Sequence, residues 1–297
     1  MPQMFKLGVL LFAPAIAFAQ NPGTPKFEVA SVKPAGPEHE PPYVVREGPG
    51  TADPERITYE RTNLLRLLTM AYRPFGGYDP VHMLDWDQII GPAWISTQIY
   101  SIDARLPPGT TKEQLPLVWR DFLAERFHLK THVEQREFTV YELTVVKGGP
   151  KFRPSGDPSW KLPPGFPVPR AGETRALSVM LPRDTCQTFV NNSMNDLIQQ
   201  LAWPLSDWSS SSYVGYLAMG KVIDKTGLTG KYDFALEYAG RHGPGDTHLA
   251  PLPDGEADTA PPLFEAVRQQ LGLQLRETKM KLDVLVVDSV DRNPTDN

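Results

Sequence analysis

Hydrophobic and polar positions first follow the patterns of a strand and a helix. Residues 26–33 (KFEVASVK) alternate and stop at Pro34, which predicts a strand. Further along the chain, apolar residues at Leu64, Leu65, Leu68 and Tyr72 have helical spacing, which predicts a helix. Either Thr62 or Asn63 serves as its N-cap. Alternation then returns in a half-buried strand, at Tyr100, Ile102, Ala104 and Leu106.

A second helix is predicted within residues 112–127. Thr110 and Glu113 have the spacing of a capping box, and the apolar stripe that follows consists of Leu115, Val118, Trp119, Phe122, Leu123 and Phe127. Residues 129–149 then predict two strands with a turn near 134–137, and a pair of glycines ends the unit.

The same order of patterns returns after residue 185. Residues 194–203 (MNDLIQQLAW) repeat the helical spacing of the first helix, and residues 222–238 (VIDKTGLTGKYDFALEY) repeat residues 89–105 (IIGPAWISTQIYSIDAR) when one residue is skipped. Near the end, residues 271–273 (LGL) take the place of residues 127–129 (FHL). We therefore expect a tandem duplication of one β-α-β-β-α-β-β unit.

These patterns favour an α+β fold. Helices packed on one face of a mainly antiparallel sheet would cover both apolar surfaces, in two such sandwiches or in one continuous sheet that both repeats share. Proline, 31 of 297 residues, marks the boundaries. We expect a signal peptide at 1–19, an N-terminal strand and proline-rich loop at 20–56, repeats at 57–150 and 186–297, and a proline-rich connection at 151–185.

The first residues have the form of a secretory signal peptide. Lys6 precedes an apolar run, and the A-x-A pattern at residues 17–19 predicts cleavage after Ala19. The alternative, a membrane anchor, needs about 20 unbroken apolar residues. Because no other segment is long enough to span a bilayer, we expect a soluble protein, secreted or periplasmic, without a membrane span after cleavage.

Charge and cysteine content narrow the classes of partner. The net charge of -5 lacks the basic excess on which nucleic-acid binding depends, so we expect no nucleic-acid partner. Cys186 is the only cysteine, which rules out an internal disulfide. Its thiol is either buried as a small apolar group or exposed and able to pair with another chain. We expect no cofactor.

Several longer strings resemble one protein family. They are FEVASVKP, GPAWI before YSIDAR, LAERFHLKTHVEQREFTVYELTVVKGGPKF, GLTGKYDF and LVVDSVDRNPTDN. Together they resemble the soil-associated family of exported proteins of unknown function that is expanded in Acidobacteria, and that family is similar to the extracytoplasmic C-terminal domain of beta-lactam-sensor-like membrane metallopeptidases. The resemblance implies secretion and brings no catalytic residues. Where the family usually reads IDHVE, residues 287–291 read VDSVD, so that histidine is missing.

The motifs of common hydrolases are absent from the sequence. His39-Glu40 lacks the second histidine of H-E-x-x-H, and His128 and His132 lack a further ligand, so we expect no metal site. Residues 225–227 match the K-T-G of penicillin-binding enzymes, but no S-x-x-K supplies a nucleophile, and the match predicts a turn. The weak catalytic candidates are Asp85 and Asp87, which would have to converge on one cleft to act as acid and base.

Aromatic residues are abundant in the loops that follow the first helix of each repeat. Such loops form stacking surfaces for sugars, peptides or proteins, or they cover the open end of each sheet as part of the core. The ligand-binding candidates are Tyr72, Phe75, Tyr78, Trp86, Trp203, Trp208, Tyr213 and Tyr216.

The sequence thus favours an exported, non-catalytic binding or interaction module. Its partner would be an unknown glycan, peptide or protein in the cell envelope or outside the cell. One alternative is a hydrolase of envelope polymer or peptide, to which Asp85 and Asp87 contribute. The other is a sensor-like ligand-binding domain, which depends on the family resemblance alone.

Overall fold

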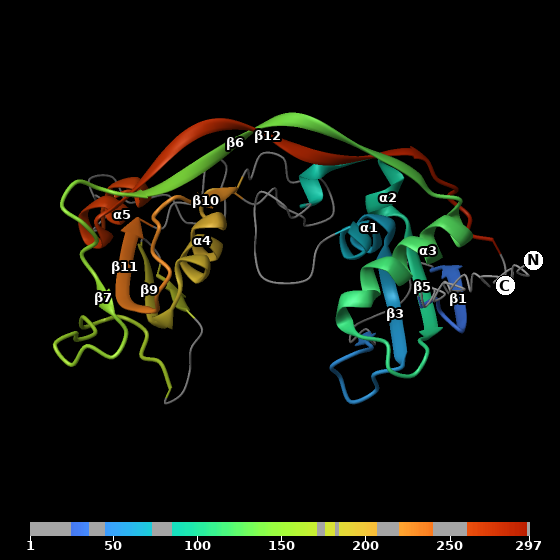
Figure 1. The fold of residues 1–297 in the computed structure, drawn as a ribbon, viewed down its shortest axis with the longest axis horizontal. Helices are drawn as coiled ribbons and strands as arrows, with labels where there is room; N and C mark the ends of the chain where they lie inside the picture. The colour runs from blue at the N-terminus through green and yellow to red at the C-terminus, as the bar shows by residue number, and fades with distance from the viewer. Residues whose placement is uncertain are drawn as a thin grey trace, which may run out of the picture.

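The protein consists of two lobes joined by a long two-stranded ribbon, as the computed structural model shows (Figure 1). The structure describes residues 25–35, 45–72, 85–170, 176–181, 184–206, 220–239 and 260–295. Its sheets are mostly antiparallel and its helices pack on them, so the predicted α+β class is confirmed. The predicted signal peptide lies outside the described residues.

The first lobe is a four-stranded antiparallel sheet covered by helices on one face. In spatial order its strands are β1 (Val29–Pro34), β5 (Ile99–Arg105), β3 (Arg56–Asn63) and β2 (Val45–Glu47). The covering helices are α1 (Leu64–Tyr72) and α3 (Leu115–Phe127) (Figure 1). Shorter elements connect them, namely η1 (Trp86–Gln88), β4 (Ile89–Ile90), α2 (Trp94–Thr97) and η2 (Lys112–Gln114). Since β1 pairs with β5 throughout, the N-terminal strand belongs to this lobe.

The predicted stripes of this lobe are buried. Every apolar residue predicted to face the sheet from α3 is buried, and so are the four alternating positions from Tyr100 to Leu106. Asn63 is the cap of α1, because its Oδ1 accepts from the backbone N–H of Arg66 at 2.9 Å. The predicted capping box of Thr110 and Glu113 is wrong by one residue, since Thr111 and Gln114 form it at the start of η2.

The ribbon pairs β6 (Lys130–Val145) with β12 (Leu273–Ser289) in antiparallel register. The turn predicted near 134–137 does not form, and one 16-residue strand continues through it. In the ribbon, both faces of these central residues are polar or solvent-exposed, so alternation of hydrophobicity could not identify a strand there. The first predicted unit therefore ends in one long strand rather than two short ones.

The second lobe has the same strand order as the first. Its sheet contains β7 (Arg153–Pro154), β11 (Tyr232–Ala239), β9 (Asp184–Asn192) and β8 (Leu177–Met180), in that spatial order. Helices α4 (Met194–Ala202) and α5 (Leu263–Leu271) pack on it. Because β7 and β8 lie between residues 151 and 185, the predicted connection contributes both edge strands of this sheet.

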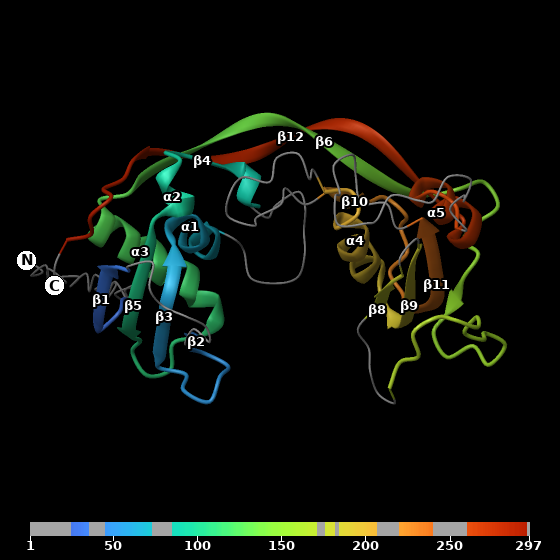
Figure 2. The same cartoon turned by 180° about the vertical axis from the view of Figure 1, so that it is seen from behind.

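Each lobe receives part of its core from the far end of the ribbon. Leu285 and Val287 of β12 are buried among the side chains of the first lobe, whereas Leu143 of β6 is buried in the second. The short strands β4 and β10 (Val222–Asp224) add to opposite edges of the ribbon in parallel pairing (Figure 2). Both predicted arrangements therefore contribute, because two separate sheets are bridged by a third that reaches both lobes.

No helix among the described residues is long and apolar enough to cross a membrane.

Candidate functional site

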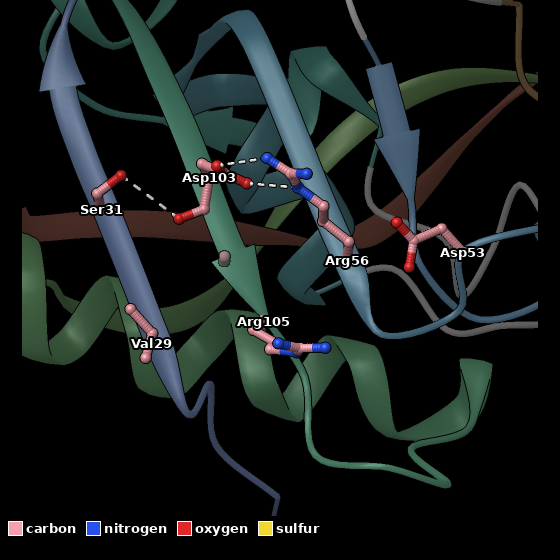
Figure 3. Close-up of a pocket in the computed structure, with 7 residues that line it drawn as sticks. Val29, Ser31, Asp53, Arg56, Asp103 and Arg105 are labelled. Carbon is pink, nitrogen blue, oxygen red and sulfur yellow. Dashed lines mark hydrogen bonds and ion pairs between the residues drawn. The ribbon is translucent and has the colours of Figure 1, made fainter.

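The sheet of the first lobe leaves one face uncovered by helices, and polar side chains line it. Because side chains alternate along a strand, burial of Ile57, Ile102 and Ala104 against the helices directs their neighbours to the opposite face. We call this surface the polar sheet face, and it consists of Ser31, Arg56, Thr58, Asp103 and Arg105. Figure 3 labels all of these residues except Thr58.

Asp103 is the centre of a hydrogen-bond network on this face. The guanidinium of Arg56 donates to both carboxylate oxygens, from Nε to Oδ1 at 3.1 Å and from Nη2 to Oδ2 at 2.8 Å (Figure 3). Thr58 Oγ1 donates to Asp103 Oδ1 at 3.2 Å, and Ser31 Oγ donates to the Asp103 carbonyl at 3.4 Å. Such bidentate pairing fixes the orientation of both side chains.

The charges on this face keep Asp103 ionised. Hydrogen bonds from Arg56 lower the pKa of Asp103 against the opposing effect of partial burial, and Thr58 and Arg46 lower it further. Arg105 has a longer contact, 3.5 Å from its Nη2 to Glu55 Oε2, and 66% of its side chain is exposed. Arg105 is therefore the cation with most freedom to turn toward a ligand.

An open recess of about 480 Å³ lies over these strands. It is lined by Val29, Ser31, Asp53, Arg56, Asp103, Ala104 and Arg105. The recess combines two guanidinium groups, the carboxylates of Asp53 and Asp103, a serine hydroxyl and a valine side chain that is mostly exposed, and Asp103 already pairs with Arg56. Arginine binds carboxylates in a planar, bidentate manner, so the loosely held Arg105 is the group in the recess that suits a ligand carboxylate.

The same place in the second lobe has different side chains. In the first lobe Arg56 is opposite Arg105 and Thr58 is opposite Asp103. Both strand pairs contain a register shift, and pairs at the same distance from it can be compared. Arg56 with Arg105 then corresponds to Cys186 with Glu237, and Thr58 with Asp103 corresponds to Thr188 with Ala235. Because the second sheet forms without the two arginines or the aspartate, this strand order does not require them.

Asp85 and Asp87 do not converge as an acid pair. Asp85 caps η1, where its Oδ1 accepts from the backbone N–H of Trp86 at 2.8 Å. Asp87 accepts from Lys221 Nζ at 2.8 and 2.9 Å, and the Lys221 side chain is only 5% exposed. The two carboxylates therefore have separate structural partners.

Three of the eight aromatic candidates lie within the described residues. The Tyr72 hydroxyl is 2.9 Å from Thr131 Oγ1, and the guanidinium of Arg120 lies over the Tyr72 ring. Trp86 packs against the core of the first lobe, and Trp203 is exposed at the end of α4. Phe75, Tyr78, Trp208, Tyr213 and Tyr216 lie outside the described residues.

His128 and His132, at the start of β6, each contact one aspartate near the C-terminal end of β12. His128 Nδ1 is 2.8 Å from Asp291 Oδ2, and His132 Nδ1 is 2.7 Å from Asp288 Oδ1. Within the part of the chain that the structure describes, no three potential ligands gather to hold a metal ion.

Two smaller predictions concern Thr226 and Cys186. Thr226 forms a tight turn with Asp224, as the K-T-G interpretation predicted. Cys186 is buried, so it behaves as a small core side chain, and burial together with Glu237 raises the pKa of its thiol to about 11.

The sequence did not identify the polar sheet face as a site. Its residues come from three strands, and Arg56 and Asp103 meet only through strand register. The available signal was the polar half of each alternating strand, as in residues 99–105 (IYSIDAR). The alternation predicted which residues face solvent but not which strands are neighbours.

Comparison with known families places the chain in one of them. The family described as "Protein of unknown function (DUF3738)" matches residues 80–290, and the chain belongs to that family. No curated protein and no solved structure matches the chain.

Proposed function

We propose that this member of the DUF3738 family is an exported, non-catalytic binding module that recognises a carboxylate-bearing ligand through its polar sheet face. The supporting observation is the pairing of Arg56 with Asp103 beside the more loosely held Arg105. Ion pairs this exposed contribute little to folding, whereas oriented guanidinium groups are well suited to recognition.

The site of action that we propose is the cell envelope or the space outside the cell. The signal-peptide pattern of residues 1–19 and the resemblance to exported, sensor-related proteins support this location. Peptide stems of cell-wall fragments carry free carboxylates, so they are the ligand class that combines this location with the chemistry of the recess.

A non-catalytic role agrees with the partners of the weak catalytic candidates. Asp85 caps a helical turn, and Asp87 pairs with a buried lysine, so neither carboxylate is placed to share a proton with the other. The ligand should therefore leave the protein chemically unchanged.

Calorimetric titration of the mature chain, starting at residue 20, with soluble muropeptides tests the proposal. We expect saturable binding, and Arg105→Gln should weaken it by roughly tenfold or more, because a charge-assisted hydrogen bond contributes about 1.5–3 kcal/mol. Arg276→Gln is the matched control: Arg276 is 69% exposed and contacts Glu142 on the ribbon, far along the sequence from the recess.

Mass spectrometry of the recovered muropeptides completes the test. Intact muropeptides support a binding module, whereas cleavage would establish a hydrolase and overturn the proposal. Absence of binding, or equal affinity of the Arg105→Gln and Arg276→Gln variants, would show that the polar sheet face does not bind this class of ligand.

A further inference from the structure

The strand registers of the two lobes correspond pair by pair. In the first lobe Thr62 pairs with Tyr100, the register then shifts, and Tyr59 pairs with Ile102. In the second lobe Asn192 pairs with Tyr232, the register shifts between Tyr232 and Phe234, and Phe189 pairs with Phe234. A shift at the same place in both sheets is a detail that a chance similarity of strand order would not reproduce.

The correspondence extends to the outer edge of each sheet. Pro34 at the end of β1 pairs with Tyr100, and Pro154 at the end of β7 pairs with Tyr232. A proline lacks a backbone N–H, so both edges end at a residue that cannot extend the ladder.

The helices that precede the ribbon strands end in the same way. His128 after α3 and Gly272 after α5 both have left-handed backbone conformations, with φ of 47° and 66°. Tyr141 lies as many residues after His128 as Leu285 does after Gly272. Tyr141 pairs with Val222, the first residue of β10, and Leu285 pairs with Ile89, the first residue of β4. The ribbon is therefore related to itself by an approximate two-fold axis.

Each long strand crosses this axis and completes the lobe of the other half. Leu285 and Val287 follow α5 in sequence but are buried in the first lobe, and Leu143 follows α3 but is buried in the second. The ion pair of Lys221 with Asp87 also joins one half to the other.

We infer that the chain is a fused pair of equivalent halves, 25–150 and 151–295, and that each half is the binding partner of the other through exchanged β6 and β12. The covalent connection between the halves is then not required to hold the folded halves together. This inference is independent of the proposed ligand.

Cleavage of the folded full chain tests it. A site-specific protease sequence inserted between Pro164 and Gly165, in an exposed turn, allows the connection to be cut after folding. We expect the two fragments to elute together on size exclusion at the volume of the uncut chain and to separate only in denaturant. Separation in native buffer would overturn the inference.

Paired cysteines test the exchanged register in the cut protein. Gln135 is opposite Asp283 and Thr139 is opposite Lys279, and the approximate axis exchanges these two pairs. A disulfide in Gln135→Cys/Asp283→Cys and one in Thr139→Cys/Lys279→Cys should each join the fragments on a non-reducing gel. The out-of-register control, Gln135→Cys/Lys279→Cys, should not join the fragments. Equal cross-linking by this control would refute the register of β6 with β12.

Discussion

Replacement of Leu285 by alanine tests whether the last strand completes the core of the first lobe. Leu285 is fully buried in β12, where it pairs with Ile89 on one side and Val133 on the other. It packs in the same cluster as the fully buried residues Leu64 and Leu123, although it lies more than 150 residues after them in the chain. The substitution removes apolar contacts that only the exchanged strand provides.

The expected cost is about 3 kcal/mol in the free energy of unfolding. Truncation of a buried leucine to alanine loses its transfer free energy and leaves a cavity, which together cost about 2–5 kcal/mol. For a chain of 297 residues, about 3 kcal/mol corresponds to a decrease in melting temperature of roughly 5 °C. Val133→Ala, at an exposed position on the facing strand, should change stability by only about 0.5 kcal/mol.

Urea unfolding followed by far-UV circular dichroism and by tryptophan fluorescence measures both variants. Trp119 is fully buried in the first lobe and reports on that core. We expect the fluorescence transition of Leu285→Ala to move to lower urea while Val133→Ala overlays the parent. Equal midpoints for the two variants would refute the assignment of β12 to the core of the first lobe.

Three further predictions concern single polar interactions. Burial acts to raise the pKa of Asp233, but hydrogen bonds from the backbone of Asn191 and Gly156 and from Ser155 outweigh it, so the pKa is lowered. The carboxylate therefore stabilises the fold above its unfolded pKa of about 4, and this contribution is lost as pH falls through its lower pKa in the folded protein. Thermal melts between pH 6 and 3 should therefore show a smaller acid loss for Asp233→Asn than for the parent. Lys221→Met should cost roughly 3–5 kcal/mol in urea unfolding, and adding Asp87→Leu should recover most of it, because an unpaired charge is worse than no pair. Asn63→Ala should cost about 1 kcal/mol in the same assay through loss of the cap of α1, and no change would contradict its capping role.

The helices and lobe strands were predictable because one face of each is buried. The stripe from Leu115 to Phe127 and the alternation from Tyr100 to Leu106 both correspond to buried residues. In such elements hydrophobic periodicity records the direction of the core directly. The fold class therefore followed from local sequence alone.

The sequence pattern aligned the first helices of the two predicted units one turn away from the alignment of their observed starts. The sequence matched Leu64, Leu65 and Leu68 with the spacing of Leu197, Ile198 and Leu201, but α1 begins at Leu64 and α4 at Met194. Counted from these starts, Leu67, Leu68 and Ala71 occupy the matching positions, and all are buried. A shift of three or four residues preserves the face of a helix, so periodicity could not choose between the two alignments.

The ribbon and the polar sheet face could not be predicted for a different reason. Residues 133–137 of β6 are polar or exposed, so hydrophobic alternation does not mark a strand there, and the small buried cluster near them joins Val140 to Ile223 and Leu282 from distant parts of the chain. The pairing of Arg56 with Asp103 joins strands far apart in the sequence. Local patterns carry no information on such partners, which depend on how the whole sheet assembles.

The ion pair on the polar sheet face contributes little to folding. Arg56 and Asp103 are each about half exposed, and ion pairs of that kind contribute little to stability in water. The second lobe forms the same strand order and register with cysteine, alanine and glutamate in the places of Arg56, Asp103 and Arg105. In the second lobe Cys186 and Thr188 at these places are buried, whereas in the first lobe Arg56 and Arg105 lie at the surface over an open recess.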